Sequence, residues 1–468
     1  MKKYRTEQDS LGKKNIPADK YYGVQTQRAI ENFPISGVPI SHYPMLIKAL
    51  AAVKYAAAKA NMELHVLKKE IAEALMAAAQ EILDGQHLEH FPIDVIQGGA
   101  GTSSNMNINE VLSNRALELL GHQKGDYQFV HPNNHANQSQ STNDVYPTAI
   151  RIAIIWLTEI LLKEMENLKN AFLKKGEEFS DVIKMARTEL REAVPITLGQ
   201  EFHAYGVTIE EDIARLKEIL KLCGEINMGA TAVGTGINTK KGYAEKVCRY
   251  LSEITHLELI TAKDLVEATS DAGVFVTFSS MLKRFAVKLN KICNDLRLMS
   301  ASVGAGWGEI FLPAVQPGSS IMPGKVNPVI PEVLNQICFQ VMGNDTTITF
   351  AASNGQLELN AFEPIIIYNL LESLRILTQG CVVLREKCIL GIKANKKRCR
   401  EEVIQSPGLL TALAPYIGYD AASKLAKEMM KSKANSFELI KKSKLISSKK
   451  LREILSPNKM THPNIEDE

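Results

Sequence analysis

The chain has 468 residues, of which 45% are hydrophobic and 23% are charged, a composition typical of a soluble globular protein with two or three domains. The formal net charge is only +3, so charge gives no reason to expect nucleic-acid binding. The longest purely apolar run near the middle, residues 152–157, is far shorter than a membrane span, and the first residues lack the apolar core of a signal peptide.

The seven cysteines are scattered along the chain, and no two of them form a CxxC pair. An odd number without paired spacing argues against a disulfide framework and against a zinc site, and it favours the reducing cytoplasm. We therefore expect a cytoplasmic protein with no metal and no membrane association. The cysteines stand at positions 223, 248, 293, 338, 381, 388 and 399.

Residues 1–142 are predicted to form a mixed, mostly helical N-terminal domain. Turns are expected at Gly85, Gly98–Gly101 and Pro132. Two stretches rich in hydroxyl and amide side chains, at 97–107 and 137–144, precede predicted helices. Such residues either cap a helix, here with Ser141 or Thr142, or bind an anion at its N-terminus. Both interpretations stay open at this point.

Two histidines, His131 and His135, are four residues apart, the spacing of a helical metal site. Pro132 between them disfavours one continuous helix, and no cysteine lies nearby. We do not expect a metal here.

Residues 143–395 are predicted to form a mainly α domain, a bundle of long helices, because apolar residues recur at spacings of three and four. The longest seam, counted from Phe275 to Met299, covers roughly 36 Å of helix. The three seams comprise Ile150, Ile154, Leu157, Leu161, Met165, Leu168 and Phe172; Ile209, Ile213, Leu216, Leu220, Cys223 and Ile226; and Phe278, Leu282, Phe285, Leu289, Ile292, Leu296 and Met299.

Around Phe275 and at 365–367, apolar residues spread round the helix instead of forming one stripe. A helix that is apolar on several sides must be buried on several sides. We expect these segments to pack against other copies of the chain; the alternative is a large core within one chain.

Residues 396–468 are predicted to form a small third domain of short, charged helices, interrupted at Pro407, Gly418 and Pro457. Lysine is frequent from residue 431 to 459, but acidic and apolar residues are interleaved. A solvated helix face is therefore expected there.

The segment Gly318–Pro328 combines glycines, hydroxyls, one lysine and one amide. Lys325 and Asn327 offer the charge and the amide donor that a carboxylate needs, and Ser319 with Ser320 adds hydroxyls. These residues predict a mobile anion-binding loop, with an ordinary polar turn as the alternative.

Taken with the stretches at 97–107 and 137–144 and the segment 187–190, this loop suggests a small substrate with several negative charges, such as a dicarboxylic acid. The sequence contains no Walker A, GxGxxG, HExxH or GxSxG pattern. This argues against nucleotide binding, metalloprotease and hydrolase functions.

The segment GSSIMPGKVNP at 318–328 is similar to the signature of the fumarase/aspartase superfamily. GAGTSSNMN at 99–107 and QSTND at 140–144 resemble two further signature regions, in the same order. This resemblance implies a long helix bundle that forms the core of a homotetramer, with each active site built from three subunits.

Within the superfamily, the chain resembles the branch that deaminates L-aspartate to fumarate more than it resembles class II fumarase. Four segments carry this distinction: 121–128, 267–271, 343–347 and 355–357. The implied reaction is a reversible anti-elimination through an aci-carboxylate intermediate, without a cofactor. A class II fumarase and a catalytically silent binding paralogue remain alternatives.

The resemblance also implies roles for single residues. Ser319 is implied to be the general base that removes the Cβ proton, with backbone N–H groups lowering its pKa. Lys325 and Asn327 are implied to hold the β-carboxylate. The remaining carboxylate and the amino group fall to Thr102, Ser141, Thr142, Asn143 and Thr188.

Three positions depart from the family pattern. Glu189, which is implied to bind the substrate, stands where the family usually has His or Gln, and it would meet Glu332, which is implied to lie behind the substrate-binding residues. Gly304 stands where an arginine is usual, within 302–306, and Asn134 replaces an aspartate. Like charges in contact would raise one carboxyl pKa, so Glu189 is the departure with the clearest consequence for the substrate.

Overall fold

The computed structural model describes residues 3–302, 304, 306–432, 436–454 and 456–462, so Val303 and Ala305 lie outside the described residues. The chain divides into two compact units. The first comprises Met1–Leu162, Ala214–Arg284 and Gln340–Ile376, and the second comprises Lys163–Ile213, Phe285–Phe339 and Leu377–Glu468. The domain division predicted above, which follows chain order, stays a prediction.

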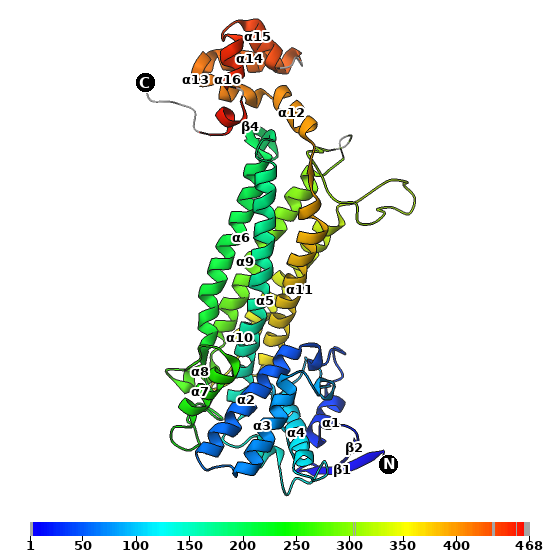
Figure 1. The fold of residues 1–468 in the computed structure, drawn as a ribbon, viewed down its shortest axis with the longest axis vertical. Coiled ribbons are helices and arrows are strands. Elements are labelled where there is room, and N and C mark those ends of the chain that lie inside the picture. Colours follow the sequence, from blue (N-terminus) through cyan, green and yellow to red (C-terminus); the bar gives the residue numbers. More distant parts are fainter. Residues whose placement is uncertain (1–2, 303, 305, 433–435, 455, 463–468) are drawn as a thin grey trace. The chain divides into compact units, whose positions relative to one another are not determined.

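The N-terminal part of the first unit is mostly helical, as predicted, and it also contains one antiparallel hairpin. Its elements are β1 (Tyr4–Asp9), β2 (Gly12–Pro17), α1 (Val24–Asn32), α2 (Pro44–Glu63), α3 (Lys69–Leu83) and α4 (Thr102–Leu119). Helix α3 packs beside both α2 and α4 (Figure 1). Helix α2 is rich in alanine, which combines high helix propensity with a small side chain that allows close packing.

Later segments of the first unit add α7 (Tyr243–Thr255), α8 (Leu265–Ser270) and a two-stranded parallel pair, β5 (Glu225–Ile226) with β6 (Ile260–Thr261). Helix α7 packs against α2. It has one strongly apolar face, with Val247, Cys248 and Leu251 buried.

Five long helices confirm the predicted mainly α architecture. They are α5 (Thr142–Glu178), α6 (Leu198–Leu220), α9 (Gly273–Met299), α10 (Val329–Ser353) and α11 (Glu363–Lys387). The seam predicted for α9 is confirmed, because each of its apolar residues from Phe278 to Met299 is at most 2% exposed. In α5 the seam residues are buried except Leu157, which is half-buried.

The third predicted seam is wrong at its C-terminal end. Helix α6 ends at Leu220, whereas Cys223 lies in a 3-10 turn and Ile226 lies in β5. Both side chains are buried, which explains the apolar pattern. Gly224 ends this turn, and a Cβ there would lie 2.7 Å from the Glu258 carbonyl oxygen, so the position requires glycine.

The apolar residues that spread round α11 are mostly covered within one chain, since Ile366 and Ile367 are buried and Ile365 is half-buried. Helix α5 and the stretch Glu363–Gly391 are long and apolar enough to cross a membrane, but 72% and 56% of their most apolar windows are buried inside the protein. Burial to this extent is typical of helices in the core of a protein.

The second unit contains a β-hairpin, β3 (Ile183–Thr188) with β4 (Arg191–Thr197), and the short pair β7 (Ile310–Phe311) with β8 (Lys393–Ala394). Its C-terminal part is a group of short helices, as predicted (Figure 1). They are α12 (Lys396–Gln405), α13 (Ala414–Ile417), α14 (Tyr419–Ser432), α15 (Ser436–Ser443), α16 (Ser448–Ile454) and α17 (Pro457–Thr461). The predicted interruptions at Pro407, Gly418 and Pro457 are confirmed. All seven cysteines are buried and unpaired.

Candidate functional site

The segment 318–328, here named the signature loop, is closed on itself. The Gly318 N–H donates to the Lys325 carbonyl at 2.7 Å, and Asn327 Nδ2 donates to the Gly318 carbonyl at 2.9 Å. A Cβ at Gly318 would lie 2.7 Å from the Lys325 oxygen and 2.8 Å from the Asn327 nitrogen, so the loop requires glycine here.

Ser319 lies at the start of this closed loop and is half-buried. Its Oγ accepts hydrogen bonds from the backbone N–H groups of Ile321, at 3.2 Å, and Met322, at 2.9 Å. Donors aimed at an oxygen stabilise negative charge on it. The neighbouring Ser320 is exposed.

Lys325 is exposed, and its ammonium makes no ion pair with any described residue, so its charge is available to a ligand. Asn327 uses one amide hydrogen for the Gly318 carbonyl, which leaves its second hydrogen for another acceptor. Glu332 lies in the first turn of α10 and is half-buried.

Thr188 and Glu189 lie at the tip of the β3–β4 hairpin and are exposed. Thr188 pairs with Arg191, so Glu189 and Leu190 alone form the turn, with φ of 53° and 62°. This is the type I′ pattern, which usually takes Asn-Gly, and two side-chain-bearing residues in it store backbone strain. Among the described residues, no hydrogen bond or ion pair joins Glu189 to Glu332.

A buried charge cluster lies beside strand β3 of this hairpin. Glu309 is fully buried and lies 2.9 Å from Lys184 Nζ and 2.6 Å from Arg187 Nη1. Arg187 also pairs with Glu402 of α12 at 2.7 Å and stacks on Trp307, 4.1 Å from the ring centre. The cluster holds in place the strand that ends at Thr188.

The second group of predicted site residues lies at the start of α5. The Ser141 N–H donates to Asp144 Oδ1 at 2.9 Å, and Ser141 Oγ accepts from the Asn143 N–H at 3.3 Å, so Ser141 also caps the helix. Thr142 Oγ1 accepts from Asn105 Nδ2 at 3.1 Å, and Asn143 Nδ2 donates to a backbone carbonyl. The capping interpretation is confirmed for Ser141, and anion binding by this segment stays a prediction.

Thr102 is the first residue of α4 and is exposed. Its hydroxyl donates to the Gly99 carbonyl at 2.7 Å. Gly101 before it has φ of 87°, and a Cβ there would lie 2.4 Å from the Tyr146 ring, which explains the glycine. Thr102 and Gly99 line a cavity of about 800 Å³.

The structure therefore places the predicted residues in two groups. Thr102 and 141–143 belong to the first unit, whereas 188–189, the signature loop and Glu332 belong to the second. The whole of α5 stands between Thr142 and Thr188 in the sequence. One buried residue near this segment could not be predicted from the sequence. Lys54 of α2 donates hydrogen bonds to Asn137 and Gln140, but a single lysine in an alanine-rich helix forms no motif.

His131 precedes a five-residue π-helix, Pro132–Ala136, and His135 lies within it, so the two histidines do not share a continuous α-helix. Nδ1 of His131 accepts from the Asn133 N–H at 3.0 Å, and Nδ1 of His135 accepts from the His131 N–H at 2.8 Å. Both rings cap backbone, which supports the expectation that they hold no metal.

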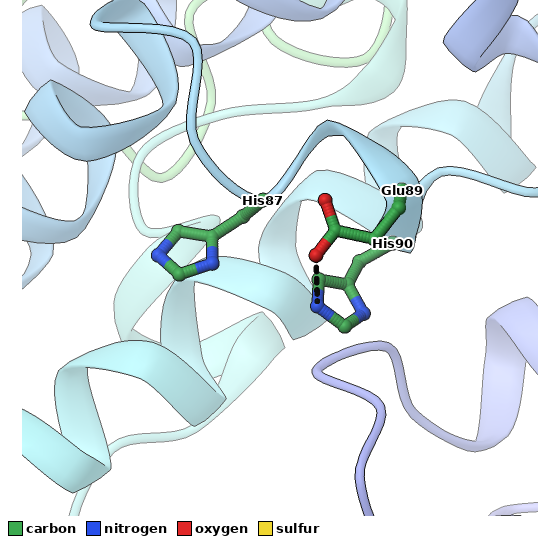
Figure 2. A group of neighbouring side chains, drawn as sticks. All are labelled: His87, Glu89 and His90. Atoms are coloured by element: carbon green, nitrogen blue, oxygen red, sulfur yellow. Dashed lines mark ion pairs between the residues drawn. The ribbon is translucent and has the colours of Figure 1, made fainter.

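A different group, His87, Glu89 and His90, brings three ligand atoms within 4.8 Å of one another (Figure 2). Nε2 of His87 lies 2.9 Å from Glu81, which Arg115 holds with two hydrogen bonds. This leaves Nδ1 of His87 as an acceptor, the arrangement expected of a metal ligand.

His90 does not fit a metal in the same way. Its Nδ1 accepts from the Tyr21 N–H at 3.4 Å, so its proton lies on Nε2, the nitrogen 3.2 Å from Glu89. A cation at Nε2 would move that proton to Nδ1, against the Tyr21 N–H. Burial lowers the pKa of His90 to about 4, so the ring is neutral. We assign this group a structural role.

Comparisons with known proteins identify the family to which the chain belongs. The sequence profile of a family described as Lyase matches residues 12–343, and that of the fumarase C C-terminus matches residues 409–462. The aspartate ammonia-lyase of Pseudomonas canavaninivorans is 53% identical over 463 residues, which cover 99% of this chain and 98% of the relative.

Solved structures share the fold over the full length. The crystal structure of fumarate lyase:delta crystallin from Brucella melitensis bound to cobalt has a TM-score of 0.96 and 53% identity, and covers 98% of this chain and 100% of its own. The class II fumarase of Schistosoma mansoni has a TM-score of 0.93 and 36% identity, covering 99% and 100%. With its matching profiles, full-length relatives and shared fold, this chain is a member of the fumarase/aspartase superfamily of lyases.

Proposed function

We propose that this chain is a carbon–nitrogen lyase that reversibly deaminates L-aspartate to fumarate and ammonia. Relatives named aspartate ammonia-lyase, at 53% identity over almost the whole chain, support this activity. The observation that carries the mechanism is the closed signature loop, in which two N–H groups donate to Ser319 Oγ.

The chemical difficulty is the weak acidity of the Cβ proton. Ser319 as alkoxide takes this proton, and the electron pair moves into the β-carboxylate, which becomes an aci-carboxylate dianion. Lys325 and the free amide hydrogen of Asn327 stabilise the developing charge. The electron pair then forms the double bond as ammonia leaves Cα from the opposite side. Charge stabilisation replaces an electron sink, so no organic cofactor is needed.

The other end of the substrate needs hydroxyl and amide donors, and we propose the remaining predicted residues for it. They are Thr102, Ser141, Thr142, Asn143 and Thr188, together with Glu189, with Glu332 behind the substrate. Glu189 is proposed to face the substrate ammonium, because its carboxylate would repel a substrate carboxylate.

We also propose a cytoplasmic homotetramer with active sites shared by three subunits, and no nucleic-acid or membrane partner. Helix α5, with 37 residues, rises about 55 Å, far more than a dicarboxylate spans. Helix α10 leaves Phe339 and Phe350 exposed by 57% and 67%, and space is open beside Gly343. An apolar helix face of this kind is typical of an interface.

The tetramer is tested by Phe350→Glu, with Leu357→Glu as the control on an exposed turn. Light scattering of the purified wild type should give four times the chain mass, and Phe350→Glu should give smaller species. A wild-type monomer, or a Phe350→Glu tetramer with wild-type stability, would contradict the assignment.

Fumarate hydration is the second candidate, because the Schistosoma mansoni class II fumarase shares the fold at 36% identity. Fumarate absorbance separates the activities when L-aspartate and L-malate are supplied in parallel. We expect fumarate from L-aspartate only. Release from L-malate alone would make the chain a fumarase, and succinate binding without either turnover would make it a silent paralogue.

A further inference from the structure

Lys54 of α2 is a buried cation that makes no ion pair with a described residue. It is 3% exposed, and its Nζ donates to the amide oxygens of Asn137 at 3.0 Å and Gln140 at 2.8 Å. A buried charge held only by neutral oxygens is costly, so its position calls for a function. The segment that it contacts leads directly to the substrate-binding residues proposed at 141–143.

The side-chain oxygen of Asn137 is a shared acceptor. Besides Lys54, it accepts from Asn105 Nδ2 at 3.1 Å and Asn109 Nδ2 at 3.0 Å. A protonated lysine only donates, so the Asn137 atom facing it must be the oxygen. The Asn105 atom facing that oxygen must then be the nitrogen.

The order of donors and acceptors set by Lys54 extends to Thr142. The same Asn105 Nδ2 donates its other hydrogen to Thr142 Oγ1 at 3.1 Å. Because Thr142 Oγ1 accepts there, its own hydrogen is left for a different acceptor. The series of hydrogen bonds from Lys54 through Asn137 and Asn105 thus leaves the Thr142 hydroxyl as a hydrogen-bond donor.

We propose that Lys54 is a positioning residue for the substrate: its charge fixes the donor direction of the Asn137–Asn105–Thr142 chain, so that the Thr142 hydroxyl donates to a substrate carboxylate. This rests on the proposed function for the identity of the substrate. Lys54 does not itself touch the substrate, and it acts only while it is protonated.

The surroundings make this device sensitive to pH. The amides of Asn137, Gln140, Asn105 and Asn109 are neutral, and the buried Asp144 is the charged group that acts on Lys54. Burial lowers the pKa of Lys54 to about 7, and burial raises the pKa of Asp144 to about 6. Tyr243 of α7 also senses Asp144, and burial raises its pKa, which keeps it neutral.

The first test uses the wild-type protein and succinate, a dicarboxylate that cannot be deaminated. We expect its dissociation constant, measured by calorimetry, to rise above pH 7 as Lys54 loses its proton, and to level off about tenfold higher by pH 9, the same loss as in Lys54→Met. An affinity that is flat up to pH 9 overturns the proposal. This binding is measured without turnover, so failure to release fumarate from L-aspartate would defeat the proposed function separately.

The second test compares Lys54→Met with Lys59→Met, a half-buried lysine of the same helix that pairs with Glu253. Lys54→Met should raise KM for L-aspartate about tenfold, change kcat less than threefold, and abolish the pH dependence of succinate binding. Lys54→Arg should restore part of the affinity, and Lys59→Met should change neither constant.

Thr142→Val separates positioning from a purely structural role. Its effect on KM should be large in the wild type and small in Lys54→Met, since the variant has already lost the donor direction. If Thr142→Val raises KM by the same factor in the wild type and in Lys54→Met, the proposal is overturned. If Lys54→Met is insoluble, the pH dependence of the wild type decides.

Discussion

The backbone N–H of Met322 donates a hydrogen bond to the Ser319 hydroxyl oxygen at 2.9 Å, three residues along the same loop. The Ile321 N–H donates to the same oxygen, and the contact between Gly318 and Lys325 closes the loop behind it. One chain alone therefore contains the arrangement that would stabilise a serine alkoxide.

Glu189 tests how the hairpin tip meets the substrate. We expect Glu189→Gln to raise KM for L-aspartate about fivefold with little change in kcat, because the variant loses an attraction for the substrate ammonium that is made equally in the ground and transition states. Steady-state kinetics on wild type and variant measure this. A large gain in kcat would instead mean that the native carboxylate is a handicap.

The turn itself stores strain at Leu190, which has φ of 62° and is 68% exposed. Leu190→Gly should stabilise the protein by about 0.5–1 kcal/mol, since glycine adopts this conformation freely at some cost in chain entropy. Thermal unfolding measures the gain. Val194→Gly, an exposed position of the same hairpin in β4, should lower the melting temperature; equal effects at both positions would contradict the assignment of strain.

The buried charge cluster beside β3 should tolerate substitution poorly. Glu309→Gln removes the charge between Lys184 and Arg187 and should cost about 3 kcal/mol, because two buried cations lose their partner. It should also lower kcat/KM, since the strand that ends at Thr188 loosens. Lys396→Met breaks an exposed pair with Asp181 and should leave the melting temperature unchanged. Equal effects would contradict this ranking.

Glu363, the first residue of α11, gives a prediction about pH. It is 5% exposed, and burial raises its pKa to about 8. Between the pKa of this carboxyl in the unfolded chain and its folded value of about 8, the folded state binds more protons than the unfolded state. The free energy of unfolding therefore falls as the pH rises through this range. The melting-temperature advantage of Glu363→Gln over wild type should therefore grow from pH 5 to pH 8. The exposed Glu258→Gln should show no such trend.

The long helices could be predicted from the sequence because their apolar spacing reflects burial directly, as in α9. The same signal failed at Cys223 and Ile226, where a buried turn and a short strand continue the apolar pattern beyond the end of α6. Periodicity records which side chains are buried; it does not record where the helix changes into a buried turn.

The signature loop could be predicted because its glycine, serine and lysine follow one another in sequence. The Lys54 chain could not, since its members come from α2, α4 and the segment before α5, and only the fold brings them together. The turn at Glu189 was also missed, because neither Glu nor Leu signals a positive φ.

The most direct test of the central claim is the rate of fumarate release from L-aspartate by Ser319→Ala, beside wild type and Ser320→Ala. Ser320 is the exposed neighbour and serves as the matched control. We expect wild-type turnover in Ser320→Ala and a loss of at least a hundredfold in kcat in Ser319→Ala, with succinate affinity retained. Normal turnover in Ser319→Ala would contradict the assignment of Ser319 as the base.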